Sequence, residues 1–480
     1  MVSVLFSPSL VAPCAVHRSQ GKRPERATRA GQVEEGESPP ARGMSVERSW
    51  SWKAHRVVEG GESTTSSTTR EIQVEISFEP LRLRTNRPWK TAHSTSDVRT
   101  NASFRIRVDG SHVGTSEVGL PPVKPGIYDG TAADCEGLVV DFAEAASSND
   151  VTGVEGCPLE HEPRSEDERT YLALFRSLLG ALDDRSERYP RSARALVETA
   201  IYRCLSAAVG VTVSNLLGIG DRGQKDPRGW VQCFYTIGMA SSRADLEDDL
   251  GYGSATTSFL KFKADTDVEY VLEVFSLLEE KGLLVSGRRT VAIDANCSWT
   301  PDLASAFLRR LERYLPHIFM IEQPFPFDMP WARAHSDHRE GWERFKTDCG
   351  RHGVMVFADE SMRTSQDVAH LQRYCRGVNL KLEKAGGYRE AVRAWEACWE
   401  CGEGEGAAMK VWLGCMVGSA LNCNVIVEIL PMCDGFADLD GFLLVEKDCQ
   451  PCEPSFTLTR GPHGLLGCID LNTIAEPARL

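Results

Sequence analysis

Short apolar runs that end in a charged residue alternate with segments of helical periodicity through the middle of the chain. These runs end at Lys263 (FLKFK), Asp294 (VAID), Glu322 (FMIE), Asp359 (VMVFAD) and Lys381 (VNLK). Short continuous apolar runs are typical of buried parallel strands, and the intervening segments carry apolar residues at three- and four-residue steps. The pattern therefore predicts repeated strand–helix units, and the simplest architecture that they form is a parallel α/β barrel.

Helix-start and helix-stop signals support this alternation. After Asp294, Thr300 offers a capping side chain and Pro301 a first-turn proline, and the helix that follows Lys381 is expected to stop at Gly402. Further strand-like runs flank the charged series at VQCFYTI near 231, VWLGC at 411 and VIVEIL at 425.

Three further regions are predicted around or before the barrel, which we place at residues 229–445. Residues 71–228 hold alternating runs (EIQVEISF, ASFRIRVDG, VGTSEVGL) and then two helical stretches, which predict an α+β capping domain. Its segment 82–91 (RLRTNRPWKT) reads either as a loop that closes over the barrel mouth or as an ordinary surface turn. Residues 446–480 are expected to pack back on the cap.

The first 70 residues have a different composition. Up to Gln32 one acid, Glu25, stands against five basic residues, and GESPPARG and GGESTTSSTT follow without periodicity. Such a segment is typical of a disordered extension or of an organelle transit peptide, and translation could also begin at Met44. Either a cytoplasmic or a plastid or other organellar location fits this reading.

Charge and hydropathy narrow the class of partner. The formal net charge is -14 in 480 residues, which disfavours nucleic acid and anionic membrane surfaces. No stretch of about eighteen apolar residues offers a membrane span. A small-molecule substrate is the partner that remains, and the oligomeric state stays open, a homo-oligomer included.

Sixteen cysteines are scattered through predicted helices and strands, so we expect most of them to be buried free thiols. Two Cys-x-x-Cys pairs, Cys398/Cys401 and Cys449/Cys452, raise the alternative of a structural zinc site. The first pair lies inside a predicted helix, where this spacing arises easily, and the interval between the pairs is long for zinc. The role of the two pairs is left open.

The charges at the strand ends carry the candidate chemistry. Because the carboxyl ends of parallel strands meet at one mouth of a barrel, three carboxylates and two lysines are expected to converge there. Three carboxylates suit Mg²⁺ and leave room for a substrate carboxylate. Such an ion stabilises the enediolate that forms when a base removes the proton next to that carboxylate.

Two lysines indicate the reaction type. Lys263 and Lys381 lie on strands far apart in the barrel, so they are expected to face each other across the substrate. One would take the proton and the other would return it to the opposite face, which inverts the stereocentre. A cycloisomerase or dehydratase needs only one face, so the pair favours 1,1-proton transfer over those reactions. Lys261, a like charge two residues away, is expected to lower the pKa of Lys263.

Two aspartates suggest the substrate. Asp438 and Asp440 lie two residues apart in ADLDG, so their side chains share a face of an extended segment. Paired carboxylates suit a cationic ammonium group, which an acylated amino acid or succinylbenzoate lacks. A polar turn is the alternative interpretation.

These residues carry a family resemblance. The motifs follow the α+β cap in a fixed order: Lys-x-Lys at Lys261 and Lys263, DAN at Asp294, IEQP at Glu322, ADES at Asp359, NLKLEKAGG at Lys381, GCMVGSAL at Cys415 and DLDG at Asp438. Over residues 71–450 this order resembles the enolase superfamily of the muconate-lactonizing and mandelate racemase type. Within it, the order resembles the dipeptide epimerases of the L-Ala-D/L-Glu type.

The resemblance implies a modified TIM (β/α)7β barrel with an N-terminal α+β capping domain, and a role for each motif residue. The resemblance implies that one Mg²⁺ is bound by Asp294, Glu322 and Asp359, and that the acid/base pair consists of Lys263 and Lys381. It also implies that Thr236 and Lys261 touch the substrate, that Cys415 contacts it through the backbone, and that Asp438 and Asp440 receive its α-ammonium group.

The chain departs from the usual epimerase pattern at Gly418, often acidic in relatives, at Arg203–Cys204, where many carry an aspartate, and in extra residues at 332–347. The first puts side-chain specificity in doubt. The alternatives are an o-succinylbenzoate synthase, an N-acylamino acid racemase, a muconate cycloisomerase-like enzyme, or an enolase-fold protein that only binds a ligand.

Overall fold

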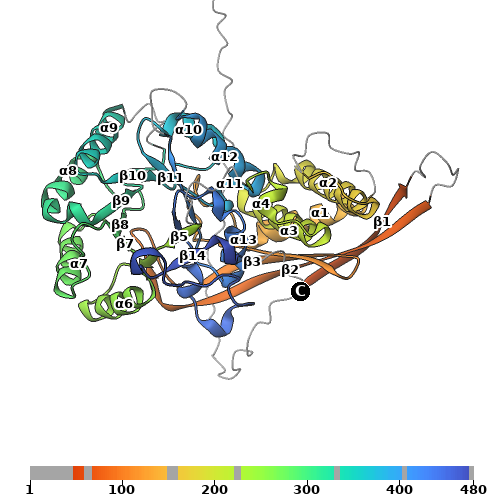
Figure 1. Cartoon of the computed structure of the whole chain (residues 1–480), viewed down its shortest axis with the longest axis horizontal. Coiled ribbons are helices and arrows are strands. Elements are labelled where there is room, and N and C mark those ends of the chain that lie inside the picture. Colours follow the sequence, from red (N-terminus) through yellow and green to blue (C-terminus); the bar gives the residue numbers. More distant parts are fainter. Residues whose placement is uncertain are drawn as a thin grey trace, which may run out of the picture. The chain divides into compact units, whose positions relative to one another are not determined.

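Two β-sheets organise the part of the chain that the computed structural model describes (Figure 1). It describes residues 47–58, 68–148, 161–220, 229–328, 336–402 and 408–474, all within one compact unit, Ser45–Leu480. One sheet has four antiparallel strands and the other has ten strands. Within these ranges, no helix combines the length and the apolar character needed to cross a membrane.

The first sheet is the predicted cap. Its strands, in spatial order, are β1 (Arg48–Val58), β2 (Thr68–Lys90), β3 (Thr95–Val108) and β4 (His112–Val118). Alternate residues such as Ile76 on β2 and Ile106 on β3 are buried, as period-two patterning requires. Helices lie on that side of the sheet (Figure 1). α1 (Ala132–Ser147) and α3 (Arg191–Val209) pack on the strands, α2 (Glu166–Ser186) packs on α1 and α3, and α4 (Val213–Leu216) packs on α3.

β1 lies inside the segment 1–70 that was expected to lack packed structure, and there the expectation is wrong. The strand pairs with β2 in continuous register, and the partly buried Trp50 and Trp52 pack against the core. The sequence signal for this strand is a short W-S-W alternation. The polar residues around it made this alternation hard to recognise as a strand. The remainder of the proposed extension, 1–46 and 59–67, lies outside the described residues, as does the transit-peptide interpretation.

The segment 82–91 is also different from the expectation of a loop. β2 continues through it to Lys90, with a register shift against β3 between Arg84 and Trp89. Trp89 and Thr91 nevertheless reach the cavity described below, so the segment approaches the barrel mouth as a bulged strand.

The second sheet is the barrel. Its strands are β5 (Trp230–Cys233), β6 (Tyr235–Ile237), β7 (Leu260–Lys263), β8 (Val291–Asp294), β9 (Ile318–Glu322), β10 (Met355–Ala358), β11 (Gly377–Leu380), β12 (Lys410–Gly414), β13 (Phe436–Asp438) and β14 (Cys468–Asp470). All neighbours are parallel except β14, which is antiparallel to β5. β5 pairs with β13 and β6 with β7, and only Phe234 separates β5 from β6, so the sheet curls round to this segment.

Helices alternate with these strands and lie outside them (Figure 1). They are α6 (Arg243–Thr256), α7 (Val268–Glu280), α8 (Pro301–Arg310), α9 (Ser336–Arg351), α10 (Ser365–Leu371), α11 (Leu382–Ala385), α12 (Tyr388–Glu400) and α13 (Ala420–Val427). The series ends on β13, which confirms the predicted (β/α)7β barrel with an N-terminal cap. Thr300 caps α8 and Pro301 opens it, as predicted.

One predicted strand is wrong, because VIVEIL at 425 belongs to α13 and the turn after it. All residues of α13 are buried, so it lacks the polar face that reveals a helix in sequence. The C-terminal region also differs from the expectation, since β14 joins the barrel sheet. The start of that region does contact the cap, where Arg84 of β2 pairs with Glu446 at 2.5 Å.

An aromatic cluster fills the barrel beneath the strand ends. It consists of Phe234, Phe259, Ala292, Met320, Phe357 and Trp412, with Phe234 stacked on Trp412 at 4.7 Å between ring centroids. Ala292, Met320 and Phe357 each precede a candidate metal ligand by two residues and share its face of the strand. The site described next therefore has a rigid apolar floor.

Every cysteine in the described ranges is a free thiol. Cys398 is buried on α12, whereas Cys452 of the second pair is exposed. Among the described residues, the side chains placed to hold a metal ion are a group of three carboxylates, and no cysteine belongs to it.

Candidate active site

The strand ends bring the charged residues to one level of the barrel. Lys263, Asp294 and Glu322 are the last residues of β7, β8 and β9, and they stand opposite one another in register. Asp359 and Lys381 directly follow β10 and β11. Parallel pairing thus sets five charges side by side, as the sequence predicted.

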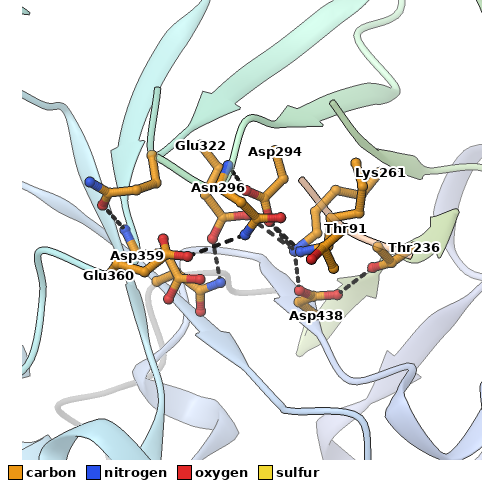
Figure 2. A network of polar contacts seen from close by, with 12 residues as sticks. Thr91, Thr236, Lys261, Asp294, Asn296, Glu322, Asp359, Glu360 and Asp438 are labelled. Atoms are coloured by element: carbon orange, nitrogen blue, oxygen red, sulfur yellow. Dashed lines mark hydrogen bonds and ion pairs between the residues drawn. The ribbon is translucent and has the colours of Figure 1, made fainter. Parts of the chain in front are cut away.

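Three of these residues form a buried carboxylate group, shown in Figure 2. One oxygen from each of Asp294, Glu322 and Asp359 lies within 4.8 Å of the others, and all three side chains are buried. Burial raises the pKa of Glu322 to about 7, and the neighbouring Asp294 and Asp359 act in the same direction. Hard anionic oxygens that repel one another in a dry site fit a small divalent cation such as Mg²⁺.

The two candidate acid/base lysines stand at opposite ends of this group. Lys263 Nζ donates to Asp294 Oδ2 at 2.6 Å, and Lys381 Nζ donates to Asp359 Oδ2 at 2.9 Å. Burial alone would lower the pKa of Lys381, but the carboxylate of Asp359 outweighs it and the pKa is raised. In strand order the carboxylates of β8 to β10 therefore lie between the two lysines.

Lys261 occupies the centre of a carboxylate cluster. Its Nζ lies 3.1 Å from Glu322 Oε2, 3.7 Å from Asp294 Oδ2, and is also bonded to Asp438. Although burial opposes its charge, these carboxylates raise the pKa of Lys261 well above its usual value. The sequence predicts that Lys261 acts on Lys263 as a like charge two residues away, whereas in the structure three carboxylates balance the charge of Lys261.

Asp438 and Asp440 do share one side of the site, as their spacing predicted. Thr236 Oγ1 donates to Asp438 Oδ1 at 3.1 Å, and the Thr236 backbone N–H donates to Asp440. Burial raises the pKa of Asp440 to about 7, with a further contribution from Asp438. Cys415 adjoins both, since its N–H donates to the Asp438 carbonyl at 2.8 Å and its Sγ accepts the Gly441 N–H.

A cavity of about 270 Å³ connects these groups. The barrel contributes to its lining Thr236, Lys261, Lys263, Asp359, Lys381, Cys415, Asp438 and Asp440. The cap contributes Trp89, Thr91, His93 and Arg99, and the segment before α1 adds Tyr128. A cavity of this size, lined by charged groups from two parts of the fold, suits a small-molecule substrate.

Several functional neighbours were missed by the sequence analysis. Asn379 Nδ2 donates to Glu322 Oε1 at 2.6 Å, and Lys384 Nζ donates to Asp359 and to the Asn379 carbonyl. Gln323 Oε1 accepts the backbone N–H groups that follow β10, at 2.9 and 3.1 Å. Each of these residues lies close to a motif residue in the sequence. That closeness was the signal from which their place in the site could have been predicted.

Two loop residues at the strand ends adopt left-handed backbone angles. Asn296 has φ 43° and Gln323 has φ 37°, although neither is glycine. The Asn296 N–H donates to Asp294 Oδ1 at 3.0 Å, and its Nδ2 donates to Glu360 Oε1 at 3.2 Å (Figure 2). Strained backbone at a site is maintained by such contacts, which here hold the carboxylates in place.

The departure at Gly418 has a steric explanation. A Cβ at this position would lie 3.0 Å from Glu117 Oε1 and 3.1 Å from Asn422 Cβ. Glu117, from the cap, is buried there and accepts from Ser419 N at 3.0 Å. An acidic side chain at 418 would meet this carboxylate. At the second departure, Arg203 Nε pairs with Glu428 at 2.8 Å.

Comparison with known proteins gives a consistent set of relatives. Residues 251–453 match a family model described as enolase C-terminal domain-like. An enolase superfamily member of Dictyostelium discoideum is 30% identical over 408 residues, which cover 79% of this chain and 91% of that protein. An L-Ala-D/L-Glu epimerase of Bacteroides thetaiotaomicron is 27% identical over 265 residues, 54% of this chain and 58% of that protein.

Among solved structures, the fold is similar to a substrate-liganded L-Ala-D/L-Glu epimerase from Bacillus subtilis. The TM-score is 0.59 with 20% identity, and the match covers 82% of this chain and 95% of that one. At this identity the likeness concerns the fold.

Proposed function

Because the chain belongs to the enolase superfamily, we propose that it epimerises dipeptides at the α-carbon of their second residue, with Mg²⁺ held by Asp294, Glu322 and Asp359. The observation that carries this proposal is the pair Lys263 and Lys381, which line one cavity from either side of the carboxylate group. A two-base inversion needs two proton-transfer groups on opposite faces of one carbon.

The reaction follows from the placement of these groups. A bound Mg²⁺ would neutralise the charge that develops on the substrate carboxylate when the α-proton leaves. One lysine, in its neutral form, removes the proton from one face, and the other, charged, delivers a proton to the opposite face. Lys261 and Asn379 hold Glu322 by hydrogen bonds to its two oxygens, which fixes the carboxylate group while protons move.

The aspartate pair supports a substrate with a free amino group. Asp438 and Asp440 are buried and line the cavity on the side where Thr236 fixes both carboxylates. The raised pKa of Asp440 reflects its burial and then its neighbour Asp438. A substrate ammonium group would offset both effects, whereas an N-acyl group or succinylbenzoate would not.

The test compares free and N-acetylated forms of one dipeptide. Neutralising both aspartates, D438N with D440N, should lower kcat/KM for the free dipeptide by roughly 10- to 100-fold, the effect of a charge-assisted bond of about 1.5–3 kcal/mol. The N-acetylated form should be hardly affected. Asp434→Asn, a change at an aspartate outside the cavity, provides the control. A wild-type preference for the N-acylated form would move the assignment to an N-acylamino acid racemase.

A further inference from the structure

The strand β1 leaves one edge of the cap sheet open. It is the outer strand in the order β1-β2-β3-β4, so no strand of the described chain pairs with the backbone groups on its far side. The opposite outer strand, β4, is covered, because α3 and α13 pack on it and its last three residues are buried. On β1 the residues from Arg48 to Ala54 alternate between exposed and partly buried, and none of these seven is fully buried.

An open edge of this length needs an explanation, because its N–H and C=O groups can pair with another chain. Proteins commonly protect such an edge with a proline, a bulge or an unpaired charge. β1 is 11 residues long, contains no proline and pairs with β2 in continuous register. Its lysine, Lys53, forms an ion pair with Glu71 of β2 at 2.6 Å. That charge is therefore balanced within the sheet and does not repel a further strand.

The exposed face of β1 is complementary to a second copy of itself. When two identical strands pair antiparallel about a two-fold axis, the residues before the axis stand opposite those after it. An axis at Trp50 sets Glu47 opposite Lys53 of the second copy and Ser49 opposite Ser51 of the second copy. Opposite charges in directly opposed positions stabilise a strand pair, and the symmetry forms this pair twice.

The helix-facing side of β1 agrees with the same axis. Arg48 lies on this side, where it pairs with Glu136 of α1 at 2.7 Å. The axis at Trp50 sets Arg48 opposite Trp52 of the second copy, a combination in which a guanidinium can lie over an aromatic ring. An axis at Trp52 would instead set Arg48 opposite Arg56 of the second copy, and like charges in that position are destabilising.

We propose that β1 is a homodimer interface, in which two copies pair antiparallel about a two-fold axis at Trp50. Two cap sheets of four strands each would then form one continuous sheet of eight strands. The inference concerns assembly and does not rest on the proposed function. β1 precedes residues 71–450, which carry the family resemblance, so the interface would be an addition to the shared cap and barrel.

The experiment reverses the two charges separately and follows self-association by sedimentation velocity over a concentration series. Wild type should form a dimer. Glu47→Lys and Lys53→Glu each set like charges opposite one another, so each should weaken the dimer by roughly 10- to 100-fold. In an equimolar mixture of the two variants, opposite charges meet again at both positions of a heterodimer. The mixture should therefore associate nearly as strongly as wild type.

A matched control reverses a charge on the same face of the sheet away from its edge. Arg105 of β3 is exposed and stands beside Ser77 of β2, which in turn stands beside Ser49 of β1. Arg105→Glu should leave the dimer unchanged. All three single variants should keep the wild-type thermal unfolding temperature, because exposed ion pairs contribute little to stability.

Hydrogen exchange tests the interface without any substitution. The backbone amides of residues 48–54 should exchange more slowly at protein concentrations where wild type is a dimer than at concentrations where it is dissociated. Exchange in β1 that is independent of dimer formation would overturn the proposal.

Three further outcomes would also overturn it. The first is a wild type that stays monomeric at every concentration. The second is a dimer that persists in both single variants, because its interface would lie elsewhere on the molecule. The third is a pair of dissociated variants that fail to associate when mixed, because the charges would then not meet across the axis at Trp50.

Discussion

At the scale of single residues, the site depends on where charge can be balanced without water. The carboxylates of Asp294 and Asp359 each hold a lysine Nζ, while Lys261 is held by Glu322 and Asp438. Pairs this deeply buried persist only because each partner satisfies the other. The same rule singles out Arg99, whose charge no described residue balances.

The lysine pair allows a direct test of the two-base assignment. Lys263→Ala and Lys381→Ala should each reduce epimerisation by at least about 100-fold, because each serves one face of the carbon. Each variant should still exchange the α-proton of one enantiomer with D₂O, with opposite preferences, as NMR can follow. Lys124→Ala, a lysine that lines the cavity away from the strand ends, is the control. Full epimerisation by either strand-end variant would contradict the assignment.

At the scale of elements, the barrel strands serve two layers at once. The charges lie at or just after their last residues, and Ala292, Met320 and Phe357, two positions before the three carboxylates, belong to the floor together with Phe234 and Trp412. Lys261 Nζ lies 5.7 Å from the centroid of the Trp412 ring, so floor and site are in contact. Packing of the floor therefore bears on the position of the charges above it.

The tight contact between β11 and β10 gives an element-scale prediction. A Cβ at Gly377 would lie 2.4 Å from Phe357 Cζ, so Gly377→Ala must displace a ring of the floor. We expect a loss of about 1–3 kcal/mol in the free energy of unfolding, the usual effect of overpacking. Urea unfolding measures it.

Gly251→Ala in α6 is the matched control. No atom lies within 4 Å of a Cβ at that position, so the same change should stabilise the helix by roughly 0.5–1 kcal/mol. If the two substitutions had equal effects, the floor would be more adaptable than the close contact implies.

At the scale of the whole molecule, the candidate site is formed by cap and barrel together. The cap supplies Trp89, Thr91 and Arg99 to the cavity, and Glu117 of β4 fastens the segment after Cys415. Anything that binds only the assembled site should stabilise the entire unit.

Metal binding should therefore be visible in thermal unfolding. At about 100-fold excess over its Kd, Mg²⁺ should add roughly 2.7 kcal/mol relative to EDTA, since it binds the folded state alone. Glu322→Gln should lose most of this gain, because it removes one of three anionic ligands. Glu360→Gln, a buried carboxylate beside the group, should keep most of it. Catalysis undiminished by exhaustive chelation would remove the metal from the mechanism.

The interface between cap and barrel should also impose a pH dependence. Burial raises the pKa of Glu117 above its ordinary 4.5, against hydrogen bonds from Ser419 and Asn101 that lower it, and Glu383 adds to the rise. A raised folded pKa means that the folded state binds the proton more tightly. Glu117 therefore contributes fully to the free energy of unfolding when the pH lies below its pKa in the unfolded state. This contribution is lost as the pH rises through its pKa in the folded state.

The uncharged amide in the Glu117→Gln variant resembles the protonated carboxyl of Glu117 at every pH. The variant therefore does not lose this stabilising contribution as the pH rises. The free energy of unfolding of the variant relative to wild type should therefore rise as pH increases from about 5 to 8. Urea unfolding over a pH series measures this difference. Glu144→Gln, an exposed residue of α1, should show no such trend. Parallel pH profiles for wild type and the Glu117 variant would contradict the argument.

The sequence by itself determined the barrel and the level at which its charges meet. Period-two and period-3.6 patterns report which face of an element is buried, and parallel pairing then places Lys263, Asp294 and Glu322 in register without further information. Where burial left no polar face, as in α13, the pattern could not separate strand from helix. β1 was not predicted, because two tryptophans were the only strong strand signal in its sequence.

Only the tertiary structure decided which charges balance one another. That Lys261 meets carboxylates from three other strands, and that Arg99 meets none among the described residues, depends on distances between segments far apart in the chain. Electrostatic balance is a property of neighbours in space, whereas periodicity is a property of neighbours along the chain. The charges at the strand ends therefore predicted the candidate chemistry. Which residues of the cap reach the cavity could be seen only in the folded structure.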